Sequence, residues 1–196
     1  MFKIFLRHGS NAALLGAFGL AALAFLSGRT GFVPIAALVG AAVFFVSEYT
    51  THRFILHARP SKTPFALRLQ ERLHYDHHVE PTRLELLFLP LWFAAPVIAG
   101  YTAIYSAITP SWPLTLSLMF GSLAALVYYE WVHYVAHIPF VPVTSFGRWM
   151  KKYHLWHHFK NEHLWFGVTN PSMDFLGRTY LRVEDVDRSA TTRILY

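Results

Sequence analysis

Four long stretches of the chain are almost purely apolar and contain no charged residue. They cover residues 11–27, 31–47, 86–108 and 112–129. At 1.5 Å per residue, a helix of about 20 residues crosses the roughly 30 Å hydrocarbon layer of a bilayer. The first two stretches are slightly shorter, but a helix can continue into the polar residues that flank them. We therefore predict membrane-spanning helices at about residues 11–27, 31–51, 86–108 and 112–135.

The short polar gaps between these stretches predict how the spans are paired. Residues 28–30 separate the first two spans and residues 109–111 separate the last two, which indicates two helical hairpins. The 196 residues are 54% hydrophobic and 14% charged, with a mean hydropathy of +0.33, which is far more apolar than a soluble domain. We expect one all-α integral membrane domain over residues 1–196, with a helical cap formed by residues 58–83 and 138–196.

Basic residues predict which side of the membrane the cap occupies. Of the 17 Lys and Arg residues, only Arg29 lies on the far side of the four-span arrangement. The positive-inside rule therefore places both termini and the cap in the cytoplasm. The net charge of +6 has the same origin. Basic residues confined to membrane-flanking segments favour contact with anionic lipid head groups, and we expect no nucleic-acid partner.

Histidine is the residue type whose arrangement indicates chemistry. Most of the 12 histidines fall into four clusters, HRFILH, HYDHH, HYVAH and HLWHH. The clustered residues are His52, His57, His74, His77, His78, His133, His137, His154, His157 and His158. On a helix, positions i, i+3 and i+4 share a face, so each cluster offers several imidazoles to one point. Adjacent histidines point about 100° apart, which suits two metals better than one. We predict a binuclear metal centre with these ten residues as ligands.

The predicted topology brings the clusters to one depth. The first and third clusters lie at the cytoplasmic ends of spans two and four, and the other two lie in the segments that follow those spans. Because the orientation rests on Lys and Arg alone, this agreement is independent of the histidines. A single structural zinc needs about four ligands and commonly uses thiolates, but the chain has no Cys. Ten imidazoles therefore indicate more than a structural zinc site.

Three carboxylates are candidates to support the ligands. Glu48 lies four residues before His52, and Glu130 lies three residues before His133, so each shares a helical face with that histidine. Carboxylates inside apolar helices are costly and usually paired. We expect each to accept the free N–H of a metal-bound imidazole, with an ion pair to a nearby Arg as the alternative. Asp76, inside the second cluster, either does the same or faces water.

The order of the four clusters resembles a known family. The series His-x4-His, His-x-x-His-His, His-x-x-x-His, His-x-x-His-His, with HRFILH and YEWVHYVAH at the ends of two spans, is similar to the fatty acid hydroxylase superfamily of membrane di-metal oxygenases. Within it, the likeness is greatest to the fatty acid or sphingolipid 2-hydroxylases. The segments TRLELLFLP and GVTNPSMDFLGRTY extend the resemblance over about residues 45–180. It implies that the clustered histidines are ligands and that Glu130 matches an acidic position before the third cluster.

The resemblance also implies a reaction. It points to a non-haem di-iron enzyme that uses O2 and two electrons to hydroxylate a lipid acyl chain at C2. Zinc binds similar nitrogen sites more tightly than ferrous iron, so it can replace iron in purified protein. Two-domain eukaryotic members carry a cytochrome domain with a His-Pro-Gly-Gly motif, which this sequence lacks. We therefore expect a separate electron-donor protein and, with the Ala-rich spans, a bacterial inner-membrane location.

Other functions share parts of this pattern. A sterol desaturase-like or carotenoid hydroxylase-like oxidase would use the same centre on another substrate. The non-enzyme alternative is a metal transporter or a metal-binding membrane protein. Transporter ligands are expected near the bilayer midplane on broken or polar helices, whereas the centres of these spans are apolar. His8 and His163 lie outside the clusters and are expected to be interfacial or hydrogen-bonded. The oligomeric state stays open.

Overall fold

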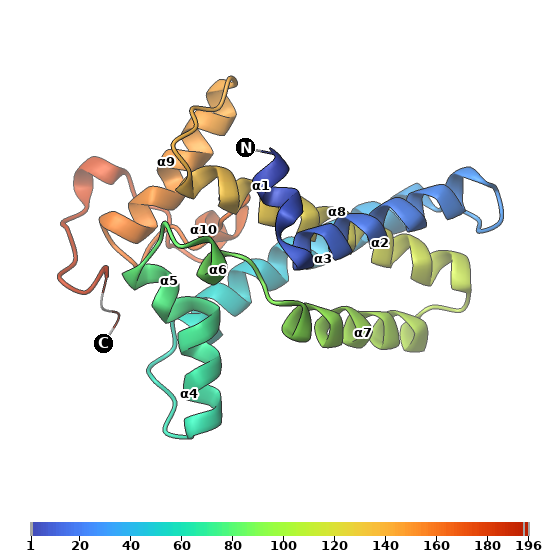
Figure 1. Cartoon of the computed structure of the whole chain (residues 1–196), viewed down its shortest axis with the longest axis horizontal. Coiled ribbons are helices and arrows are strands. Elements are labelled where there is room, and N and C mark those ends of the chain that lie inside the picture. Colours follow the sequence, from blue (N-terminus) through green and yellow to red (C-terminus); the bar gives the residue numbers. More distant parts are fainter. Residues whose placement is uncertain (1, 194, 196) are drawn as a thin grey trace. The chain divides into compact units, whose positions relative to one another are not determined.

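The structure is a computed structural model that describes residues 2–193 and residue 195 (Figure 1). Among these residues every regular element is a helix, so the predicted all-α fold class is confirmed. The chain divides into two compact units. Unit 1 comprises Met1–Phe44 with Leu89–Glu130, and unit 2 comprises Phe45–Phe88 with Trp131–Tyr196. That the whole chain forms a single domain stays a prediction.

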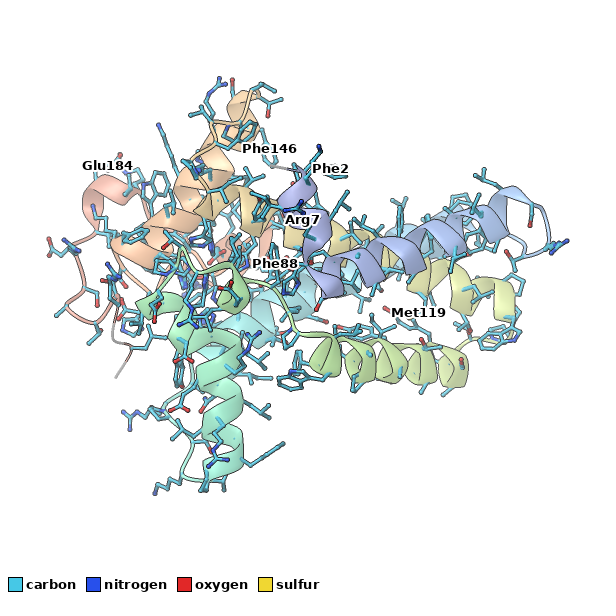
Figure 2. The ribbon with its side chains drawn as sticks, viewed as in Figure 1. Phe2, Arg7, Phe88, Met119, Phe146 and Glu184 are labelled. Carbon is cyan, nitrogen blue, oxygen red and sulfur yellow. The ribbon has the colours of Figure 1, made fainter. Side chains whose placement is uncertain are left out.

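Four helices are long and apolar enough to cross a bilayer, as predicted. The candidate spans are Gly9–Leu26, Pro34–Leu56, Leu84–Ile108 and Trp112–His137. Their main helices are α2 (Gly9–Leu26), α3 (Pro34–Thr51), α7 (Leu91–Ile108) and α8 (Trp112–His137). Large apolar side chains lie exposed along them (Figure 2), including Leu26 at 84% and Ile108 at 70%. Such surface is costly in water and favourable in lipid, so the chain is a multi-pass membrane protein.

Glycines let two spans of unit 1 approach closely. A Cβ on Gly40 of α3 would lie 2.0 Å from the carbonyl oxygen of Leu118 in α8, and a Cβ on Gly121 would lie 1.8 Å from a carbonyl oxygen of α3. Only glycine fits at both positions, which is a common basis of helix packing in membranes. The Ser122 hydroxyl donates to the Gly40 carbonyl at 2.9 Å and lies 3.0 Å from the Tyr105 hydroxyl of α7. These contacts hold α3, α7 and α8 together. A short helix, α1 (Phe2–Arg7), precedes the first span.

The helix boundaries differ from the prediction mainly at the third span. The prediction begins at residue 86, but α7 begins at Leu91, and Leu84–Leu87 form a separate short helix, α6. Pro90 disfavours a helical conformation for the residue before it, and Phe88 and Pro90 are extended. In the first hairpin, Gly28 follows α2 with φ +70°, a conformation that favours glycine.

Unit 2 contains the short helices other than α1, together with the ends of α3 and α8. Its own elements are the π-helical turns η1 (His52–Leu56) and η2 (Glu71–Tyr75), α4 (Pro64–Gln70), α5 (Asp76–Val79), α6, α9 (Ser145–Phe159), α10 (Ser172–Leu176) and the 3-10 turn η3 (Val183–Asp185). Its apolar core is built on Met150, Tyr153, Trp165 and Val186. The cap predicted at residues 58–83 and 138–196 thus contains helices, and both of its segments belong to this unit.

Candidate metal centre

A π-helical turn explains the spacing of the first histidine cluster. The amide of His57 donates to the carbonyl of His52 at 3.0 Å, a bond between residues five apart. In an α-helix, residues five apart point to different faces, whereas a π turn brings them closer to one line. The two ring centroids lie 4.9 Å apart. The second π turn, η2, likewise carries His74 and leads directly into α5. Helical turns of this kind often occur at functional sites.

All ten clustered histidines gather in unit 2 as two groups of five. The His52 group consists of His52, His57, His74, His78 and His157, and the His77 group consists of His77, His133, His137, His154 and His158. Within each group, one ring nitrogen per residue lies within 4.8 Å of all the others. The neighbours at positions 77 and 78 divide between the groups, as do those at positions 157 and 158. This division matches the expectation that adjacent helical side chains face different points.

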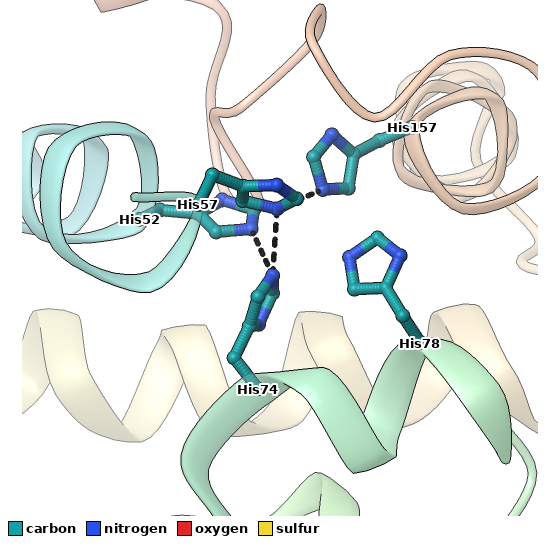
Figure 3. A group of neighbouring side chains, drawn as sticks. All are labelled: His52, His57, His74, His78 and His157. Atoms are coloured by element: carbon teal, nitrogen blue, oxygen red, sulfur yellow. Dashed lines mark hydrogen bonds between the residues drawn. The ribbon is translucent and has the colours of Figure 1, made fainter. Parts of the chain in front are cut away.

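Three separate segments supply the His52 group (Figure 3). The end of α3 with η1 supplies two rings, η2 with α5 supplies two, and α9 supplies the fifth. Figure 3 shows the five rings turned toward a common centre. Four of these five residues are buried, and His57 is partly buried. The group is therefore an interior cluster of imidazoles, and it depends on tertiary packing of segments about 100 residues apart in the chain.

Backbone carbonyls hold three rings of the His52 group by their Nδ1 atoms. The pairs are His52 with Phe166 at 2.5 Å, His157 with Leu164 at 2.8 Å, and His78 with Thr192 at 3.0 Å. A carbonyl oxygen only accepts hydrogen bonds, so each Nδ1 carries the proton. In a neutral imidazole the other nitrogen, Nε2, then keeps a free lone pair. Three lone pairs are thus directed into one buried cluster.

The Nε2 atoms lie as close together as the ligands of a metal ion. The Nε2 of His74 lies 3.2 Å from that of His52 and 2.6 Å from that of His57. The other short Nε2 pairs are His57 with His157 at 3.0 Å, His133 with His77 at 3.0 Å, and His137 with His154 at 2.9 Å. Ligands bonded at about 2.1 Å on adjacent positions of a metal stand about 3 Å apart. Nitrogens this close must share either a proton, as in a hydrogen bond, or a cation, and both donor sets have the spacing that fits a metal ion.

For the histidines that lie outside the spans, burial keeps the imidazole in its neutral form, which is the form that binds metal. Desolvation is the main cause that lowers the pKa of His74, His154 and His157 well below the usual 6.5, and neighbouring imidazoles add to the effect. Burial also lowers the pKa of His78 to about 3, against the hydrogen bond from its ring to Thr192. Neutral imidazole is the ligand form, so these nitrogens are available at neutral pH.

A partly buried carboxylate and a fully buried one hold the loop whose Phe166 carbonyl contacts His52. The Oε1 of Glu48 accepts hydrogen bonds from the amides of Val168 at 2.7 Å and Thr169 at 3.0 Å, and its Oε2 accepts one from the Thr169 hydroxyl. On the other side, Asp174 Oδ1 accepts from the amide of Phe166 at 2.8 Å. Asp174 is fully buried. The loop is therefore fixed at both ends by carboxylate oxygens that accept its backbone amides.

The expected role of Glu48 needs correction in its detail. We predicted that this carboxylate accepts an N–H from His52, but the Nδ1 of His52 is bonded to the Phe166 carbonyl. Glu48 binds the backbone amides of Val168 and Thr169 instead, and its support of the ligands stays a prediction. The helical spacing alone gave no sign of this loop, which comes from residues more than 110 positions away. Asp76 is exposed, which agrees with the water-facing alternative.

The remaining candidates have different surroundings. Glu130 is buried at 1% exposure, and its Oε1 accepts from the amide of Leu89 at 3.1 Å within unit 1. Its support of His133 stays a prediction. His163 is exposed and lies 3.3 Å from the carboxylate of Glu162, outside both groups. His8 precedes α2 and is also outside both groups.

Sequence reasoning missed the residues that shape the loop after α9. Trp165 has φ 57°, a left-handed conformation that is rare for a bulky residue, and it separates the carbonyls of Leu164 and Phe166 that contact two histidines. Its indole Nε1 donates to the Leu181 carbonyl at 2.9 Å. Asp174 belongs to the segment GVTNPSMDFLGRTY, so the resemblance marked its position. The sequence could not identify the carbonyl acceptors, because every residue has a backbone carbonyl.

Comparison with known proteins agrees with this geometry. The model of the fatty acid hydroxylase family matches residues 37–179, which contain both histidine groups.

The chain belongs to the fatty acid hydroxylase family.

Curated relatives within the family carry related names. The chain is 28% identical over 148 residues to fatty acid 2-hydroxylase of Rattus norvegicus, covering 75% of this chain and 40% of that protein. It is 32% identical over 146 residues to ceramide very long chain fatty acid hydroxylase SCS7 of Saccharomyces cerevisiae, covering 73% and 37%. It is 31% identical over 147 residues to dihydroceramide fatty acyl 2-hydroxylase FAH1 of Arabidopsis thaliana, covering 74% and 59%. The chain thus spans less than two thirds of each of these relatives.

A solved structure supports the fold of this fatty acid hydroxylase family member. The chain resembles full-length scs7p, in which only the hydroxylase domain is visible, with a TM-score of 0.75 and 28% identity. The likeness covers 91% of this chain and 66% of the other. The resemblance seen in the four histidine clusters is therefore confirmed at the level of family and fold.

Proposed function

We propose that this chain is a membrane-bound di-iron hydroxylase that acts on the acyl chain of a lipid, at C2. The observation that carries the proposal is the pair of buried five-imidazole groups with converging Nε2 atoms. Imidazole suits iron, zinc and copper alike, so the choice of iron rests on the family. The ten clustered histidines are the proposed ligands, five to each ion.

The proposed reaction balances with O2 and two electrons. The C2–H bond of the acyl group breaks, one oxygen atom becomes a hydroxyl on C2, and the other leaves as water after taking up two electrons and two protons. Bound iron would supply the redox chemistry that activates O2. The chain itself holds the ring tautomers through the carbonyls of Phe166, Leu164 and Thr192 and excludes water by burial. We propose a separate donor protein as the source of the electrons.

The position of the histidines in the chain supports attack near the lipid head group. His52 and His137 lie at the ends of candidate spans, where a helix reaches the membrane surface. An acyl lipid with its head group at that surface would have its first carbons within reach, whereas a mid-chain carbon lies deeper. The Lys and Arg distribution supports a cytoplasmic location for this surface and for both termini. The relatives' names, which include fatty acyl 2-hydroxylases, support the same substrate class. The bacterial inner membrane stays a prediction.

Lipid analysis tests this proposal directly. Lipids are extracted from cells that express the wild type or the double variant His157→Ala, His158→Ala, which removes one proposed ligand from each group. We expect acyl lipids with one additional oxygen at C2 in the wild type only, as measured by tandem mass spectrometry.

The alternatives give different products in the same experiment. Loss of two hydrogens would indicate a desaturase, and oxidation confined to a sterol or carotenoid ring would indicate those substrate classes. A change in cellular metal content with unchanged lipids would indicate a metal transporter. Any of these results would overturn the proposed function.

A further inference from the structure

The segment of residues 187–193 lies beyond the region that matches the family, yet it contacts a candidate ligand. The carbonyl oxygen of Thr192 lies 3.0 Å from Nδ1 of His78, and Thr192 is 3% exposed. The guanidinium of the next residue, Arg193, donates to the carbonyl of Val79 at 2.6 Å. Two consecutive residues of the segment therefore bind His78, the last residue of the second histidine cluster, and Val79, the residue that follows it.

A buried carboxylate after α9 anchors this segment. Glu162 is 1% exposed, and its Oε1 accepts hydrogen bonds from the hydroxyls of Ser189, at 2.9 Å, and Thr191. The amide of Ser189 also donates to the carbonyl of Lys160 at 2.8 Å. One carboxylate oxygen thus binds two residues of the segment, so Glu162 is its main fixed point.

The His78 ring depends on this segment for its tautomer. Its Nδ1 bonds to the Thr192 carbonyl, so Nε2, which is buried without a hydrogen-bond partner, is the nitrogen left to serve the His52 group. The ring also stacks on His158 at a centroid distance of 4.2 Å, a contact that fixes its plane but not its proton. His52 and His157 take their acceptors from the loop of residues 164–166 instead. A displaced segment would therefore change His78 and leave those two rings as they are.

We propose that residues 187–193 form a strap that holds His78 in its metal-binding tautomer, and that Glu162 is the positioning residue that anchors the strap. The inference rests on the proposed metal centre. It assigns a role to a buried carboxylate that is not itself a ligand, and it makes the effect specific to one of the two groups. The His77 group receives no hydrogen bond from the strap among the described residues, so its ion should be bound as before.

Metal titration of matched variants tests the strap. Glu162→Ala removes the anchor, and the double variant Ser189→Ala, Thr191→Val removes both donors. Glu162→Gln keeps an acceptor oxygen and should rescue most of the effect. Glu184→Ala is the control, because this glutamate lies on the outer surface at η3 (Figure 2) and its side chain is 63% exposed. Purified metal-free protein is titrated with Zn2+, which carries no redox chemistry. We expect one of two binding steps to weaken about 10- to 100-fold in the first two variants, with the other step unchanged.

A second measurement reads the tautomer without any metal. Ring 15N chemical shifts of metal-free protein should place the His78 proton on Nδ1 in the wild type. In Glu162→Ala they should show a mixture of the two neutral tautomers. The His78 signal is assigned by its loss in His78→Gln. Unchanged affinities at both steps, or an equal loss at both, would overturn the strap. If the wild type bound no Zn2+ but the tautomer still shifted in Glu162→Ala, the proposed metal centre would fail while the strap stood.

Discussion

Replacing Glu48 by alanine should destabilise the loop of residues 166–169 and, through it, the ring of His52. The variant removes the acceptor of two backbone amides, those of Val168 and Thr169, whose residues are only 2% and 1% exposed. A buried donor left without a partner costs about 1–3 kcal/mol, so the two amides together cost about 2–6 kcal/mol. Release of the loop would relieve this cost and move the Phe166 carbonyl away from His52.

The expected result is a weaker metal site rather than an unfolded protein. Loss of an outer hydrogen-bond partner lowers metal affinity about 10- to 100-fold, which corresponds to about 1.4–2.8 kcal/mol. This range lies at the lower end of the about 2–6 kcal/mol that the two unpaired amides would cost, so we expect the loop to move rather than leave both amides unpaired. Zn2+ titration of the metal-free variant measures the affinity, and denaturant unfolding measures the stability.

The matched control for this prediction is Glu48→Gln. Its amide oxygen can still accept from both backbone amides, and its NH2 group can donate to the Thr169 hydroxyl. We expect metal affinity within about threefold of the wild type. Equal losses in the Ala and Gln variants would mean that charge matters instead of the hydrogen bonds. Wild-type affinity in Glu48→Ala would refute the link from this carboxylate to His52.

Three further predictions concern other parts of the chain. Glu130→Ala should lower activity about 10- to 100-fold by disturbing the end of α8, and a fully active variant with normal metal content would leave this carboxylate only its bond to the Leu89 amide. The pKa of His78 is about 3 in the folded protein and about 6.5 in an unfolded chain, so protons bind the unfolded chain preferentially. Thermal melts of metal-free protein should therefore show full stability above about pH 6.5 and a decline as the pH falls toward 3; a rise would contradict the burial argument. In this Cys-free chain, a thiol reagent applied from outside should label Arg29→Cys but not Lys62→Cys, and the reverse pattern would overturn the predicted topology.

The spans were predictable because a bilayer imposes a simple requirement on sequence. About 20 apolar residues must follow one another, and the uncharged stretches satisfied that requirement. The predicted span of residues 86–108 lies within the candidate span Leu84–Ile108, but the interruption before α7 was not predicted, because Pro90 breaks the helix without changing the hydropathy. Composition reports where lipid contact is possible, whereas the backbone decides where the helix begins.

The division of the histidines was predictable only where helical geometry decides it. Adjacent residues must point in different directions, so His77 and His78 were expected at different ions, and the structure places them in different groups. The His-x4-His spacing needed a π turn, which α-helical reasoning did not anticipate. The hydrogen-bond partners of the rings could not be predicted from the sequence, because backbone carbonyls from distant loops supply them. The strap from residues 187–193 is a further case of this kind.

The metal content of an active preparation tests the central claim most directly. Total metal and iron are measured by elemental mass spectrometry on purified protein whose lipid-hydroxylating activity is assayed in the same sample. The account predicts two metal ions per chain, with activity that rises in proportion to the iron fraction. Zinc in part of the sites is compatible with this, because zinc binds such nitrogen donors more tightly than ferrous iron. A fully active preparation with one metal ion per chain, or none, would contradict the two-group centre.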